Sequence, residues 1–192
     1  MKQEPIMDLG LPEGMDMVNN LDSLEITRRW FSWKIIAMTL FAVVWDGFLV
    51  FWYSMATQSG SAIMLLFPLV HVAVGMGLTY YVLAGYMNKT RIYVDQMQIV
   101  IRHGPLPWFG NRTVDAGEVK QIYVKEHVSR SRRGGATVTF AVHMLTHGQR
   151  NVKLLSGLPN SEQALFIEQE IEKFLRIQDV PVRGQLGRRD TW

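Results

Sequence analysis

Two long apolar runs constrain the fold of this chain more than any other feature. Residues 35–86 contain one charged side chain, Asp46, among 52 residues. As helices, residues 35–56 and 62–86 would measure about 33 Å and about 37 Å, and each is long enough to cross a bilayer. The five residues between them, 57–61, are small and polar and suit a tight turn. The sequence therefore predicts a transmembrane helical hairpin over residues 35–86.

Basic residues at the two ends of the hairpin predict its orientation. Residues 57–61, in the turn, carry no charge. Three basic residues precede the first run and two follow the second, namely Arg28, Arg29, Lys34, Lys89 and Arg91. Lys and Arg resist translocation across a membrane. Both termini are therefore expected in the cytoplasm.

Asp46 is the most costly residue in the hairpin, because a carboxylate at the centre of a transmembrane helix costs about 2.5–3.5 kcal/mol on insertion scales. Counted outward from the turn, Asp46 and His71 lie at nearly the same depth, so we predict contact between them. Small residues permit close helix approach, and we expect Gly47, Ala73 and Gly77 to pack at the helix interface. The pair could fix the register of the hairpin, dock a partner helix or relay protons.

Composition excludes several classes of chemistry. The chain has no cysteine, which excludes disulfides, a thiol nucleophile, and zinc or iron–sulfur sites held by thiolates. Four histidines lack the spacing of a metal motif: His103, His127, His143 and His147. Phosphate-loop and nucleophile-elbow motifs are also absent from the sequence. We expect no enzyme activity, no metal and no cofactor.

After the hairpin the pattern becomes that of a small α+β domain. Residues 90–94, 98–102, 119–125, 137–144 and 151–155 read as short antiparallel strands, the fourth with the clearest alternation of apolar and polar residues. Residues from Asn160 or Ser161 onward place Ala164, Ile167 and Ile171 on one stripe of an amphipathic helix. We predict an antiparallel sheet or barrel over residues 87–180, closed by this helix.

The two ends of the chain read differently from this domain. Residues 1–23 are acidic and are predicted to be a flexible tail, and residues 181–192 a basic flexible tail. Residues 24–34 alternate enough to form an edge strand or an interfacial segment. The hairpin is thus expected between two soluble parts.

The combination of a two-span hairpin, short antiparallel strands and one C-terminal amphipathic helix resembles the bacterial pleckstrin-homology-like membrane proteins. The stretches that carry the resemblance are residues 29–33 (RWFSW), 46–53 (DGFLVFWY), 102–112 (RHGPLPWFGNR), 153–158 (KLLSGL) and 163–168 (QALFIE). It implies a pleckstrin-homology-like fold and a bacterial cytoplasmic (inner) membrane location. It implies no catalytic residues. Some relatives carry a cysteine-rich zinc segment at the N-terminus, and this chain has an acidic segment there instead.

Two surface features are candidates for contact with a lipid or a partner. Arg130, Arg132 and Arg133 lie in a connection between two predicted strands, where arginines can meet anionic head groups. Trp108 and Phe109, between Pro107 and Gly110, can pack beneath the sheet, enter the membrane interface or bind a partner.

These features lead to three functional hypotheses. The first is a non-catalytic interaction module, an accessory or scaffold subunit that contacts membrane lipids and other membrane subunits or copies of itself. The second is an anionic-lipid sensor that uses residues 130–133, and the third is proton or ion handling at Asp46 and His71. Residues 87–192 carry 16 basic and 10 acidic side chains, an excess too modest to favour nucleic acid.

Overall fold

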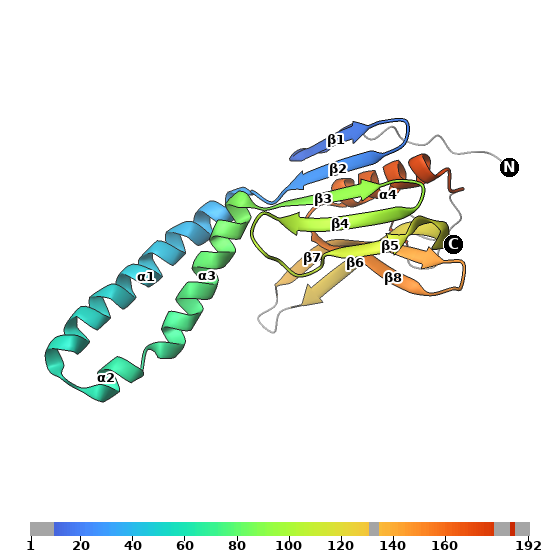
Figure 1. Ribbon diagram of the computed structural model, residues 1–192. Coiled ribbons are helices and arrows are strands. Elements are labelled where there is room, and N and C mark those ends of the chain that lie inside the picture. The colour runs from blue at the N-terminus through green and yellow to red at the C-terminus, as the bar shows by residue number, and fades with distance from the viewer. Residues whose placement is uncertain (1–9, 131–134, 179–184, 187–192) are drawn as a thin grey trace. The chain divides into compact units, whose positions relative to one another are not determined.

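The computed structural model describes residues 10–130, 135–178 and 185–186 (Figure 1). Two compact units divide the chain. One, here the β-domain, comprises residues 1–28, 90–103 and 107–192, and the other, here the hairpin unit, comprises Arg29–Lys89 and Gly104–Leu106. The hairpin is therefore inserted into the sequence of the β-domain rather than placed before it.

The hairpin unit contains the two predicted long helices. Helix α1 spans Trp33–Ser59 and ends at Gly60, whose positive φ of 65° is the left-handed conformation that glycine adopts readily. The return is made by α2 (Ala62–Leu66) and α3 (Leu69–Met87), which meet at Pro68. Proline lacks the N–H that a continuous helix requires, which explains the break. By length and composition, Trp33–Ser59 and Ala62–Met87 are both able to cross a membrane.

The first sheet of the β-domain has five antiparallel strands in the order β1-β2-β3-β4-β5. Their bounds are Met15–Asn19, Leu24–Arg29, Lys89–Val94, Gln98–Gly104 and Arg112–Asp115. Every second residue of β3 is buried, as expected for a strand with one face on the core. At the β3–β4 turn the Asp95 carboxylate accepts hydrogen bonds from the amides of Met97 and Gln98, each 2.8 Å long, and these bonds lower the pKa of Asp95.

The second sheet has three antiparallel strands in the order β6-β7-β8, at Val119–Arg130, Ala136–Thr146 and Asn151–Leu158. A short 3-10 turn, Ala116–Glu118, leads into β6, and helix α4 spans Ser161–Leu175. One buried carboxylate attaches α4 to β6, since Glu172 accepts from the Gln121 side chain at 2.6 Å and from the Ile122 amide at 3.1 Å. The amide of Ile122 is thereby satisfied by the helix rather than by another strand.

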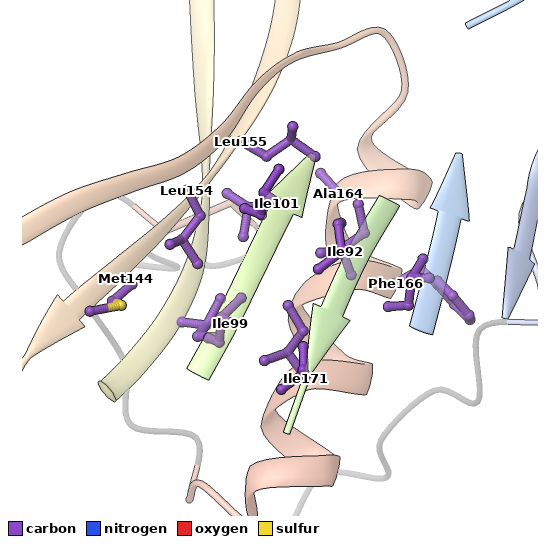
Figure 2. Packing of buried hydrophobic residues seen from close by; sticks show 14 of the residues in the cluster. Ile92, Ile99, Ile101, Met144, Leu154, Leu155, Ala164, Phe166 and Ile171 are labelled. Atoms are coloured by element: carbon purple, nitrogen blue, oxygen red, sulfur yellow. The ribbon is translucent and has the colours of Figure 1, made fainter. Parts of the chain in front are cut away.

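One core joins both sheets and α4. Figure 2 shows Ile92, Ile99 and Ile101 of the first sheet facing side chains of the second sheet and of the helix. Among the latter are Met144, Leu154, Leu155, Ala164, Phe166 and Ile171. The predicted stripe of α4 is confirmed, because Ala164, Ile167 and Ile171 are each at most 1% exposed.

The layout of a helical hairpin plus an antiparallel α+β domain is confirmed, and of the predicted sheet or barrel the structure has two open sheets. Two expectations require correction. Residues 24–34 do not supply an edge strand, because β2 lies between β1 and β3. The flexible tail predicted for residues 1–23 is wrong for residues 15–19, which form β1, while residues 1–9 lie outside the described residues.

The Gln163 side chain of α4 contacts the N-terminal part of the chain. The amide of Gln163 donates to the Glu13 carbonyl at 2.9 Å, and its oxygen accepts from the Arg28 guanidinium at 3.0 Å. Burial lowers the pKa of Arg28. At the other end, the Leu186 amide donates to the Val124 carbonyl at 2.8 Å, so part of the predicted basic tail lies along β6. The rest of residues 181–192 lies outside the described residues.

Candidate functional site

The most unusual site in the hairpin is centred on Asp46. Its carboxylate accepts a hydrogen bond from the Thr79 hydroxyl of α3 at 2.7 Å. Gly75 lies one turn before Thr79, and a Cβ built there would come within 2.6 Å of the Asp46 Oδ1 atom. The absence of a side chain at Gly75 is what lets the carboxylate approach the backbone of α3.

The predicted contact between Asp46 and His71 is wrong. The imidazole of His71 stacks on Trp45, with ring centroids 5.8 Å apart, and the Trp45 indole donates to the His71 carbonyl at 3.2 Å. His71 Nδ1 is buried and has no hydrogen-bond partner among the described residues. Counting from the turn failed because α1 continues to Ser59 and the return helix breaks at Pro68. The residue that faces Asp46 is therefore Gly75, about one helical turn beyond His71.

The small residues predicted to pack the helices are not the ones that do so. Gly47 and Gly77 have open space where a Cβ would project, and Ala73 is exposed. Gly75 and Gly85 are the close-approach positions instead, since a Cβ at Gly85 would lie 2.5 Å from the Ile35 side chain. Both helices are almost uniformly apolar, so composition does not reveal which face meets the partner helix.

The seam between α1 and α3 is narrow. The buried residues of α1 are Ile35, Ala42, Leu49 and Ala56, a spacing of seven that is typical of two helices wound together. In the most apolar stretch of Trp33–Ser59 only 17% of the residues are buried, and in that of Ala62–Met87 only 11%. The remaining apolar surface, for example Val50 at 72% exposure, has the character of a lipid-facing surface.

Polar side chains near the ends of the hairpin make further contacts. Asn88, the residue that follows α3, is 1% exposed and forms two hydrogen bonds with the backbone of Leu106. The Thr39 hydroxyl lies 3.1 Å from the Tyr86 hydroxyl. Thr79, Gly75, Gly85 and Asn88 were all missed by sequence reasoning. Only Asn88 offered a signal, as a polar residue at the boundary of an apolar run.

The two predicted surface features have different outcomes. Arg130 is exposed at the end of β6, whereas Arg132 and Arg133 lie outside the described residues. Phe109 is 82% exposed, so packing beneath the sheet is wrong for this side chain. Trp108 is half-buried, and its ring stacks on Phe109 with centroids 4.9 Å apart.

A second polar group lies across the strands of the smaller sheet. His143 is 2.8 Å from the Asn151 amide oxygen through Nδ1 and stacks on Tyr123, which accepts a hydrogen bond from Asn151. Burial lowers the pKa of His143, and the positive charges of Lys125, Lys153 and His127 add to this effect. Burial raises the pKa of Tyr123. These groups orient one imidazole on the surface of the smaller sheet.

Comparison with protein-family models finds no match, and comparison with curated proteins finds none.

Proposed function

We propose that this chain is a membrane-anchored, non-catalytic interaction module that acts as an accessory or scaffold subunit of a membrane protein complex. The proposed location is a bacterial inner membrane, with α1 and the α2–α3 segment crossing it and both termini cytoplasmic. The observation that carries the proposal is the hydrogen bonding of Asp46. A carboxylate in the middle of an apolar helix meets one donor, Thr79, in the part of the chain that the structure describes.

One donor is few for such a group. A carboxylate has about four acceptor positions, and lipid offers no water to fill those that remain. Asp46 is half-buried, so it remains accessible from outside the helix pair. A hydrogen-bond donor on a helix of another subunit, or on a second copy of this chain, would complete its coordination. Polar residues within membranes commonly mark such contacts.

The β-domain supplies the second part of the proposal. Two antiparallel sheets followed by one C-terminal helix support a pleckstrin-homology-like fold, the class that the sequence resembles. Only residues 30–32 connect β2 to α1, and only Asn88 connects α3 to β3. With such short connections, an anchored hairpin would keep the domain at the membrane surface, where it can contact the soluble parts of the same complex.

The experiment is purification of the tagged full chain in polymer nanodiscs, followed by mass spectrometry of co-purifying proteins and lipids. We expect a partner in stoichiometric amount with the natural chain, and its loss with Asp46→Leu. Asp46→Asn retains a hydrogen-bond acceptor, so a reduced amount of the partner should still co-purify. The matched control is Val50→Leu, an apolar change at an exposed position one turn further along α1, which should leave recovery unchanged.

Two results would overturn the proposal. One is equal recovery of the partner with Asp46→Leu and with the natural chain. The other is a chain that purifies alone as a monomer, with no protein partner and no second copy after crosslinking.

A lipid sensor is the second candidate. It is favoured by the exposed basic residues of β6, Lys125, His127 and Arg130, which lead into residues 131–134. Enrichment of an anionic lipid in the same purification, lost on charge reversal of Arg130, Arg132 and Arg133, would favour this function. Direct proton transfer between Asp46 and His71, the third hypothesis, gains no support because Asp46 bonds to Thr79 instead.

A further inference from the structure

The loop between β4 and β5 is held at its base by the residue that follows the second span. Asn88 donates to the Leu106 carbonyl at 3.1 Å and accepts from the Leu106 amide at 2.8 Å. This paired arrangement copies the hydrogen bonding of two neighbouring strands. Both residues belong to the hairpin unit, so Leu106 is fixed at the point where α3 ends.

The other side of the loop is held from within the β-domain. The His103 amide donates to the Asn111 side-chain oxygen at 2.7 Å, and the His103 Nδ1 atom lies 3.0 Å from the hydroxyl of buried Thr90. Gly110 has a φ of 101°, which a side chain rarely adopts, and a Cβ there would lie 3.2 Å from His103 Nε2. Residues 107–109 thus follow a residue that is hydrogen-bonded to the end of α3 and precede residues that contact His103.

The tip of this loop is apolar and exposed. Phe109 exposes 82% of its surface although its ring stacks on Trp108. An aromatic ring presented in this way has the character of a binding element rather than of a core residue.

The position along the chain indicates what the tip meets. Phe109 follows Leu106 by three residues, which span about 11 Å at most. Leu106 is itself bonded to the residue after α3, where a membrane-spanning helix would leave the hydrocarbon. Aromatic side chains are favoured at that boundary. Arg102 and Arg112, on the strands that flank the loop, are exposed and suit an anionic lipid surface.

We propose that Phe109 inserts into the headgroup boundary of the bilayer that the hairpin crosses, as an additional membrane contact of the β-domain. The occupant is lipid rather than a protein partner, because the tip lies within reach of the membrane boundary. This contact restricts how far the β-domain can swing on its short connections. The proposal rests on the membrane anchoring included in the proposed function.

The absence of cysteine in the natural chain allows a clean test. Single-cysteine variants Phe109→Cys, Met97→Cys and Val50→Cys of the full chain are labelled with a nitroxide. The labelled proteins are placed in nanodiscs of phosphatidylcholine and phosphatidylglycerol. Collision with oxygen, which concentrates in lipid, is compared with collision with a water-soluble nickel complex. Circular dichroism checks that each variant is folded.

The two reference positions define the scale. Val50 is 72% exposed on α1 and reports lipid if the hairpin is inserted. Met97 is 75% exposed, nearly as much as Phe109. It precedes the first residue of β4, whereas the loop that carries Phe109 follows the last, Gly104, which is seven residues or about 23 Å of strand from Met97. We expect position 109 to shift towards the oxygen-rich, nickel-poor behaviour of position 50, and position 97 to behave as in water.

The other outcomes separate the two proposals. Water-like behaviour at position 109 with lipid-like behaviour at position 50 would overturn the loop contact and leave the anchor intact. Protection of position 109 from both reagents would also overturn it, because a protein surface would then cover the tip. Water-like behaviour at position 50 would overturn the anchor and the loop contact together.

Discussion

The hairpin unit and the β-domain are stabilised in different ways. In the β-domain, apolar residues of two sheets and one helix meet in a shared core that excludes water. In the hairpin, the principal buried residues of α1 recur every seventh position, and polar contacts such as Asp46 with Thr79 link the helices. The hydrophobic effect drives the first arrangement, whereas in lipid it offers little preference for one apolar face over another. Close approach and hydrogen bonds must then specify how the helices pair.

The largest expected effect separates a buried isoleucine of the β-domain from an exposed isoleucine of the hairpin. Ile171→Ala in α4 removes a side chain that is 1% exposed in the core, and should lower the free energy of unfolding of the β-domain by about 2–5 kcal/mol. Ile36→Ala in α1, at a position 55% exposed, removes the same atoms and should leave that value unchanged. Urea titrations of the full chain in detergent, followed by near-ultraviolet circular dichroism, measure both. Similar losses would mean that the two regions do not differ as described.

Glycine substitutions test the close approach of the helices. Gly85→Ala places a methyl group against three atoms of Ile35, the nearest at 2.5 Å, and should destabilise the hairpin by about 1–3 kcal/mol. Gly77→Ala meets open space and should have little effect or be slightly stabilising, because alanine favours helices. Helix loss on titration with sodium dodecyl sulfate compares the two variants. A larger loss of stability with Gly77→Ala than with Gly85→Ala would mean that Gly77 lies at the helix interface, as the sequence predicted.

The hydrogen bond to Asp46 should contribute less. Thr79→Val keeps the shape of the side chain and removes the donor, and should cost about 0.6–1.7 kcal/mol in the same titration. Thr79→Ser retains the hydroxyl and should recover most of the loss. If valine and serine behave alike, the hydroxyl does not stabilise the helix pair.

The same contrast explains how much of the structure could be predicted. The alternation along residues 137–144 and the stripe on α4 identified these elements of the β-domain, because in water the inward face differs chemically from the outward face. The alternation assigned the faces of β7 only in part, since Val142 and Met144 are buried, whereas Val138 is exposed and Ala141, on the opposite face, is buried. The two spans were evident for the opposite reason, since nearly every residue is apolar. That uniformity hid the register, so Asp46 was paired with His71 and Gly77 was chosen instead of Gly75.

Long-range pairing was the other limit on prediction. Strand β1, Met15–Asn19, is a short segment without a strong pattern of apolar residues. Strand β2 lies beside β3 in the first sheet, although the whole hairpin separates the two strands in the sequence. The hydrogen bonds between Asn88 and Leu106 likewise join a residue that precedes β3 to one that follows β4. Each depends on residues far apart in the sequence, which local periodicity does not reveal.

The smallest expected effect concerns pH and the two perturbed histidines of the β-domain. Burial lowers the pKa of His103 and of His143 below the ordinary value of about 6.5, with positive neighbours adding to the effect. Well above pH 6.5 both groups are neutral in the folded and unfolded chains, and their full contribution to stability is present. As the pH falls below 6.5 towards the folded pKa values, the unfolded chain binds protons first, so stability is lost. The urea concentration at the midpoint of unfolding of the β-domain should therefore decrease as the pH is lowered from 7.5 to 5. His143→Gln removes one of the two groups and should make this decrease shallower, and an unchanged decrease would show that His143 does not contribute.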